Sequence, residues 1–223
     1  MDKIISVLTL STLLLLGGCK PEAPNDETKE KNHQDTHKLE VIFTPGTMEG
    51  DKFIADKSGK VLKFTAGVDT KWVQSDEVKP LPNVPYFVEI KHYSASGVLI
   101  NGEYATNGED KIHQHFFVPV NTGGVPIAQV IDYRYLDTDP WDAPMTTDSK
   151  VIGKENPLGL KGVMTFKTAG MNFGIRLRLM HGRSTKWNSK GEASPFYKPA
   201  IWTANAQYDV DFKFNVNVQT INN

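Results

Sequence analysis

The sequence has little of what several common protein classes require. Its 223 residues include a single cysteine, which excludes an internal disulfide and a cysteine-rich zinc site. Its 25 Lys and Arg residues nearly balance 26 Asp and Glu residues, so the net charge of −1 offers no basic surface for nucleic acid. A Gly-rich phosphate loop, a GxSxG turn and an HExxH helix are also missing. These absences exclude nucleic-acid binding and favour a binding protein over an enzyme.

Long hydrophobic runs are missing too. The longest, residues 4–16, has about thirteen residues, whereas a membrane-spanning helix needs roughly 20. It follows Lys3 and is followed by two glycines, which is the layout of a secretory signal peptide. The tetrapeptide Leu16-Gly17-Gly18-Cys19 resembles the lipobox of bacterial lipoproteins. The resemblance implies that residues 1–18 are removed and that Cys19 carries three acyl chains, such as palmitate, which would hold the protein permanently on a membrane.

The lipobox also predicts where the protein resides. A bacterial lipoprotein lies in the cell envelope outside the cytoplasm, in the periplasm or at the outer membrane, and the residues after Cys19 do not distinguish the membranes. Residues 19–37 are almost devoid of apolar side chains, so we expect a flexible tether with His33 and His37 in solvent. Residues 38–223 then form a single β-rich domain.

Period-two alternation dominates this domain. From Tyr208 to Gln219 every even position is apolar and every odd position, including Asp209, is polar, which predicts a long strand with one wet face. Seven more strands are expected from their Val, Ile, Phe and Tyr content: 38–43, 60–64, 86–93, 112–120, 125–135, 160–168 and 171–180. Within the last of these, Ile175, Leu177 and Leu179 should face inward.

The strands alternate with Gly, Asn and Pro turns and without a long helical stripe. This pattern predicts an all-β fold, an antiparallel β-sandwich of the Ig-like or Greek-key type. An up-and-down β-barrel with an internal ligand cavity is the alternative. Residues 137–159 lack periodicity, so we expect a long loop there with Trp141 as an aromatic anchor.

The best candidate for chemistry is the His-Gln-His sequence at positions 113–115. Residues two apart on a strand point to the same face, roughly 6.5–7 Å apart, so His113 and His115 could reach one metal ion. His181 is a plausible third ligand because it ends the inward-facing series of another strand. His92 and Asp132 are further options. Neutral imidazole suits Zn²⁺ or Cu²⁺, so the sequence predicts a site for one of these ions.

Aromatic residues suggest a different kind of site. Trp141, Trp187 and Trp202 lie in loop-like contexts and could line a site for a sugar or a hydrophobic ligand, although most tryptophans simply pack in the protein interior.

The lipobox and the histidines together favour one function, that of an envelope lipoprotein that binds Zn²⁺ or Cu²⁺ for storage or for delivery to an outer-membrane uptake protein. One alternative is a structural or adhesion module that displays loops to a protein or glycan. Another is a hydrolase with an aromatic-lined cleft.

Overall fold

The computed structural model describes residues 33–200 and 206–220, and strands dominate this part of the chain. The strands are β1 (Lys38–Glu49), β2 (Lys52–Ala55), β3 (Leu62–Gly67), β4 (Pro85–Tyr93), β5 (His113–Val120), β6 (Ile131–Tyr135), β7 (Lys161–Phe166), β8 (Asn172–His181) and β9 (Gln207–Asn217). The helices are the short α1 (Asn101–Ala105) and α2 (Ile127–Val130), with single 3-10 turns η2 (Val68–Thr70) and η3 (Glu109–Lys111). Within the described residues, no helix has the length and apolar character needed to cross a membrane.

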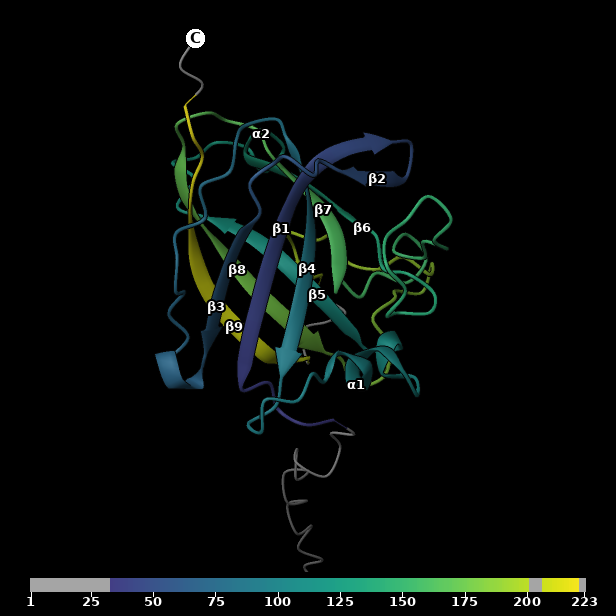
Figure 1. The fold of residues 1–223 in the computed structure, drawn as a ribbon. Coiled ribbons are helices and arrows are strands. Elements are labelled where there is room, and N and C mark those ends of the chain that lie inside the picture. The colour runs from purple at the N-terminus through teal and green to yellow at the C-terminus, as the bar shows by residue number, and fades with distance from the viewer. Residues whose placement is uncertain (1–32, 201–205, 221–223) are drawn as a thin grey trace, which may run out of the picture. The chain divides into compact units, whose positions relative to one another are not determined.

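The named strands form two sheets in which all neighbours are antiparallel. The larger sheet has the order β2-β1-β4-β7-β6, with β3 also paired to β1, and the smaller sheet has the order β5-β8-β9. Figure 1 shows the smaller sheet behind the larger one, with its strands running obliquely to those in front. The two sheets stay separate and do not close into a barrel. The prediction of an antiparallel β-sandwich is therefore confirmed, and the alternative of an up-and-down β-barrel is wrong.

Alternation along the strands fills the space between the sheets. On β9 every second side chain from Val210 to Val216 is buried, while Asp211 and Lys213 are exposed, as predicted. The ring of Phe214 lies 4.7 Å from that of Phe64 on β3, which joins the two sheets through aromatic contact. The same alternation on β8 buries the three side chains expected to face inward, Ile175, Leu177 and Leu179.

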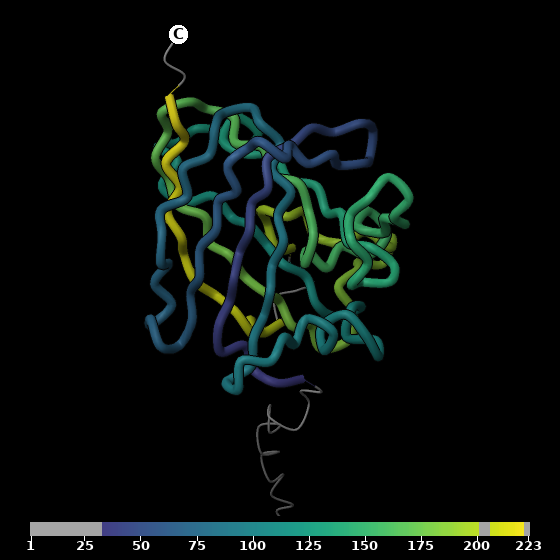
Figure 2. Tube along the Cα trace, in the orientation of Figure 1, coloured from purple at the N-terminus to yellow at the C-terminus, as the bar shows by residue number. Residues whose placement is uncertain are grey.

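The structure differs most clearly from the predicted strands around residues 125–135 and at the end of β1. Residues 125–135 do not form one strand, because Pro126 precedes the short helix α2 and only Ile131–Tyr135 continues as β6. Strand β2 was not predicted, and β1 extends to Glu49 to pair with it. Figure 2 shows the resulting β1–β2 hairpin projecting at one end of the domain.

The long loop between β6 and β7 was predicted, and two buried charged residues hold it in place. The carboxylate of Asp137 accepts hydrogen bonds from the backbone N–H groups of Leu158, Gly159 and Lys161, at 3.0, 2.7 and 3.1 Å. The Lys161 ammonium donates to Thr138 Oγ1 at 2.9 Å. Because these groups are buried and hydrogen-bonded, the loop keeps a defined shape without regular secondary structure.

Candidate metal centre

Two histidines of the candidate site face each other across neighbouring strands. In the antiparallel pair β5–β8, His113 lies directly opposite His181, and their ring centroids are 4.5 Å apart. Opposite residues in such a pair project to the same face of a sheet. The His113 side chain is fully buried, whereas His181 keeps 12% of its side chain exposed. The structure therefore brings together two of the three residues that the sequence indicated as ligands.

Asp209 joins them because β9 contains a bulge. Leu179 pairs with Val210 and Met180 pairs with Tyr208, so the register shifts by one residue at Asp209. Strict alternation would place Asp209 on the wet face of the strand. A bulge redirects the side chain that it contains, and the Asp209 side chain is only 1% exposed. The expectation that Asp209 faces solvent is therefore wrong.

The third histidine comes from the segment before β1. His33 was expected in a solvated tether, but its side chain is fully buried and packs 5.0 Å from the His113 ring, centroid to centroid. Residues 33–37, which we call the strap, are bonded to α1 through Gln34. Its backbone N–H and its side-chain amide donate to the two carboxylate oxygens of Glu103, at 2.6 and 3.0 Å. The prediction that His33 lies in solvent is wrong because the strap docks on the domain.

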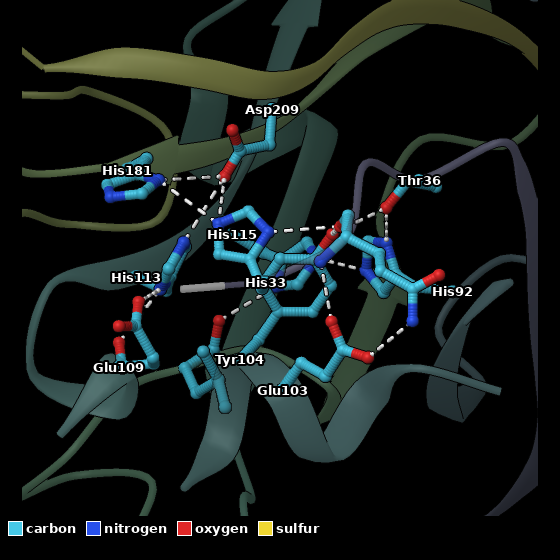
Figure 3. A network of polar contacts seen from close by, with 12 residues as sticks. His33, Thr36, His92, Glu103, Tyr104, Glu109, His113, His115, His181 and Asp209 are labelled. Atoms are coloured by element: carbon cyan, nitrogen blue, oxygen red, sulfur yellow. Dashed lines mark hydrogen bonds and ion pairs between the residues drawn. The ribbon is translucent and has the colours of Figure 1, made fainter. Parts of the chain in front are cut away.

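The donor atoms of these residues converge on one point, as Figure 3 shows. Asp209 Oδ2 lies 3.3 Å from His33 Nε2, 3.2 Å from His113 Nε2 and 3.3 Å from His181 Nδ1. His33 Nε2 and His181 Nδ1 are 3.2 Å apart. All four donor atoms lie within 4.8 Å of one another, so the group could hold a metal ion.

Backbone carbonyls orient two of the imidazole rings. His33 Nδ1 lies 3.0 Å from the carbonyl oxygen of Gln34, and His113 Nδ1 lies 2.8 Å from that of Glu109. A carbonyl oxygen can only accept, so both Nδ1 atoms carry a proton, and in the neutral form of each ring the Nε2 atom presents a lone pair. Those lone pairs face the Asp209 carboxylate, which is also an acceptor. The arrangement therefore requires a positive charge at its centre.

Protonation of the His113 ring is a poor source of that charge. Burial lowers the pKa of His113, and the opposing effects of the Asp209 carboxylate and of the Glu109 carbonyl do not cancel it. A buried imidazole favours the neutral form, which is also the form that binds metals. A carbonyl bonded to the opposite ring nitrogen is the usual support for a metal-ligating histidine. A bound metal cation therefore fits the centre of this group better than protonation of the buried imidazole does.

His115 and His92 lie outside this group and form a separate chain of hydrogen bonds. Their Nε2 atoms are 2.9 Å apart, and His115 Nδ1 lies 2.9 Å from the carbonyl oxygen of Leu158. His92 Nδ1 lies 2.8 Å from Thr36 Oγ1, which in turn contacts the Tyr104 hydroxyl at 2.8 Å. Every ring nitrogen in this chain has a partner when both histidines are neutral. The structure therefore does not place the predicted ligand His115, or the option His92, around the shared point.

Burial of this second pair predicts a pH-dependent stability. Burial lowers the pKa of His115 from 6.5 to about 4 and that of His92 well below 6.5. Below pH 6.5 these two histidines bind protons in the unfolded chain but stay neutral in the folded chain. Their contribution to the free energy of unfolding is therefore complete above pH 6.5 and is lost as the pH falls toward 4. For His115 alone we expect a loss of about 2 kcal/mol between pH 7 and pH 5.

The measurement is urea unfolding of the full chain at pH 7 and pH 5, with a chelator present so that metal binding does not contribute. His115→Gln keeps a donor for the Leu158 carbonyl but cannot titrate. This variant should lose about 2 kcal/mol less than the wild type over the same range. An equal loss in both proteins would contradict the assignment of His115 as a buried neutral group.

The other predicted site residues lie apart from the metal group. Asp132 is an exposed residue on β6. Trp141 lines a cavity of about 290 Å³ beside Asp137, whereas Trp187 lines another of about 640 Å³ beside β6. Because the two tryptophans line different cavities, they do not form one aromatic cleft. Trp202 and Cys19 lie outside the described residues.

Sequence reasoning missed His33 and Asp209 for different reasons. His33 stands in a polar segment, and polar segments before a first strand are usually solvated. Its only signal was its residue type, since five of the six histidines, all but His37, lie near one another in the structure. Asp209 gave no signal, because its position in the alternating series indicated the opposite face of the strand.

The donor atoms of the site indicate which kind of metal ion it could hold. Its donors are three imidazole nitrogens and one carboxylate oxygen, a set that suits divalent transition metals rather than the all-oxygen sites of Ca²⁺ or Mg²⁺. Three donors belong to the smaller sheet, one on each of β5, β8 and β9, and the fourth belongs to the strap. Comparison of the chain with protein-family models, with curated proteins and with solved structures finds no match in any of the three.

Proposed function

We propose that this protein is a zinc-binding lipoprotein of the bacterial envelope and that His33, His113, His181 and Asp209 are the ligands. The observation that carries the proposal is the spacing of the four donor atoms. Two ligands that each lie about 2.0–2.1 Å from a tetrahedral ion are roughly 3.3–3.4 Å apart. Four of the six separations in the group are 3.2 or 3.3 Å. The other two separations are no more than 4.8 Å, so the side chains would move closer together around a bound ion.

The same spacing favours Zn²⁺ over Cu²⁺. Zn²⁺ accepts a tetrahedral set of nitrogen and oxygen ligands, whereas Cu²⁺ prefers a tetragonal arrangement with neighbouring ligands closer together. A catalytic zinc site usually has three protein ligands and an open position for water. Four protein ligands on one tetrahedral ion support holding the metal rather than hydrolysis.

Burial supports storage or delivery of the ion. The side chains of His33, His113 and Asp209 are at most 1% exposed, and His181 is the member that reaches solvent. An ion at this position would exchange past His181. Together with the lipobox at Cys19, this supports a protein that holds zinc at a membrane outside the cytoplasm and passes it to an uptake protein of the outer membrane.

The proposal is tested by titrating the full chain, purified in detergent, with Zn²⁺ in a calorimeter. We expect one ion per chain, with Ca²⁺ as the control that produces no heat because the site has a single carboxylate. Co²⁺ then serves as a spectroscopic substitute for zinc, and a tetrahedral site produces intense visible absorption bands. An absence of heat with Zn²⁺, or the weak spectrum of six-coordinate Co²⁺, would refute the proposed site.

A further inference from the structure

The four donor residues come from two structurally different parts of the domain. His113, His181 and Asp209 lie on hydrogen-bonded neighbouring strands, so their backbone positions are fixed relative to one another by β5, β8 and β9. His33 belongs to the strap, which precedes β1 and has no regular secondary structure. The Nε2 atom of His33 nevertheless lies within 3.3 Å of both His181 Nδ1 and Asp209 Oδ2.

Other bonds of the strap lead to α1 and to the larger sheet. Gln34 is bonded to Glu103 on α1, Thr36 contacts His92 on β4, and the His37 backbone N–H donates to the Tyr93 carbonyl at 2.8 Å. Figure 3 shows Thr36 and His92 on one side of the His33 ring, with His181 and Asp209 on the other. The strap thus bridges the larger sheet and the ligand group of the smaller sheet.

The strap has no apolar side chain to anchor it. Its sequence is His-Gln-Asp-Thr-His, and its contacts with the domain include hydrogen bonds and ring contacts of polar groups. A hydrogen bond replaces a bond to water, so each one adds little net stability. A metal–imidazole bond at His33 would therefore supply a large part of what keeps the strap in place.

From these contacts we infer that the bound ion fastens the strap to the domain, so that zinc binding and strap docking strengthen each other. This inference rests on the proposed zinc site. Loss of the ion frees residues 33–37 and adds five residues to the segment between Cys19 and the domain, a gain in reach of roughly 17 Å. It also uncovers His113, His181 and Asp209, which leaves a three-ligand site open to an acceptor.

Amide hydrogen exchange of the full chain with and without zinc tests this coupling. The N–H groups of Gln34 and His37 are bonded to Glu103 and to the Tyr93 carbonyl. We expect their exchange to slow by at least tenfold when zinc binds, while exchange within β7 (Lys161–Phe166) stays unchanged. Equal exchange of the strap amides in the zinc-bound and zinc-free chain would overturn the inference.

Glu103→Ala provides the reciprocal test. Glu103 holds the strap through Gln34 and is not a ligand, so its loss should weaken zinc binding about tenfold only if docking and binding are coupled. Glu49→Ala, at the exposed end of β1, is the matched control and should bind zinc like the wild type. Equal affinity of the two variants would overturn the coupling while leaving the zinc site intact. A wild-type chain that binds no zinc would overturn both.

Discussion

Replacing His113 by alanine should weaken Zn²⁺ binding by more than about a hundredfold. Loss of a residue that only supports a ligand typically lowers metal affinity 10–100-fold, and loss of a ligand itself costs more. His113 is fully buried, and its Nε2 lies 3.2 Å from Asp209 Oδ2, at the point where the donors converge. Calorimetric titration of the full chain, with a competing chelator for the tight wild-type site, measures the difference.

His37→Ala is the matched control for this variant. His37 is the other strap histidine, but its ring faces Asp69, with His37 Nε2 3.5 Å from Asp69 Oδ1, and it lies outside the ligand group. Its removal should leave zinc affinity within about threefold of the wild type, since exposed ion pairs contribute little free energy. Wild-type affinity in His113→Ala, with the protein folded, would mean that zinc binds elsewhere.

Replacing Lys186 by methionine should lower the free energy of unfolding by about 3 kcal/mol or more. The Lys186 side chain is fully buried, and its ammonium donates to the carbonyl oxygens of Asp110, His113 and Pro157 at 2.6, 3.1 and 2.9 Å. Methionine has a similar length but no donor, so three buried carbonyls lose a strong hydrogen bond. Urea unfolding at pH 7 with a chelator present measures the change.

Lys190→Met is the control, because Lys190 is exposed on the same segment of chain. Its replacement should change stability by less than about 0.5 kcal/mol. Since one of the three carbonyls belongs to His113, Lys186→Met should also weaken zinc binding. A Lys186→Met protein as stable as Lys190→Met would show that the three carbonyls find other partners.

Most of the fold could be predicted from period-two alternation. The long series on β9 and the apolar positions of β8 identify an inner face directly, because a strand has only two faces. Strand ends were less predictable. Around residues 125–135 the apolar residues suited a strand, but a short helix forms after Pro126, and local sequence did not separate the two outcomes.

Only two of the four residues of the candidate site could be predicted from the same alternation. His113 and His181 could be proposed from alternation, because each belongs to an inward-facing series. His115 belongs to the same series as His113, yet alternation does not say which buried histidine finds which partner. The bonds of His115 to Leu158 and His92 depend on how the loop and β4 pack against β5.

The sequence by itself determined the class of fold and the inner faces of its strands, since these depend on residue spacing along the chain. Only the tertiary structure decided the ligand group. Asp209 turns inward because β8 and β9 pair with a one-residue bulge. His33 docks because Glu103 bonds its neighbour Gln34 and because its ring packs against those of His113 and His181. Both events join residues that are far apart in the sequence, so no local pattern could record them.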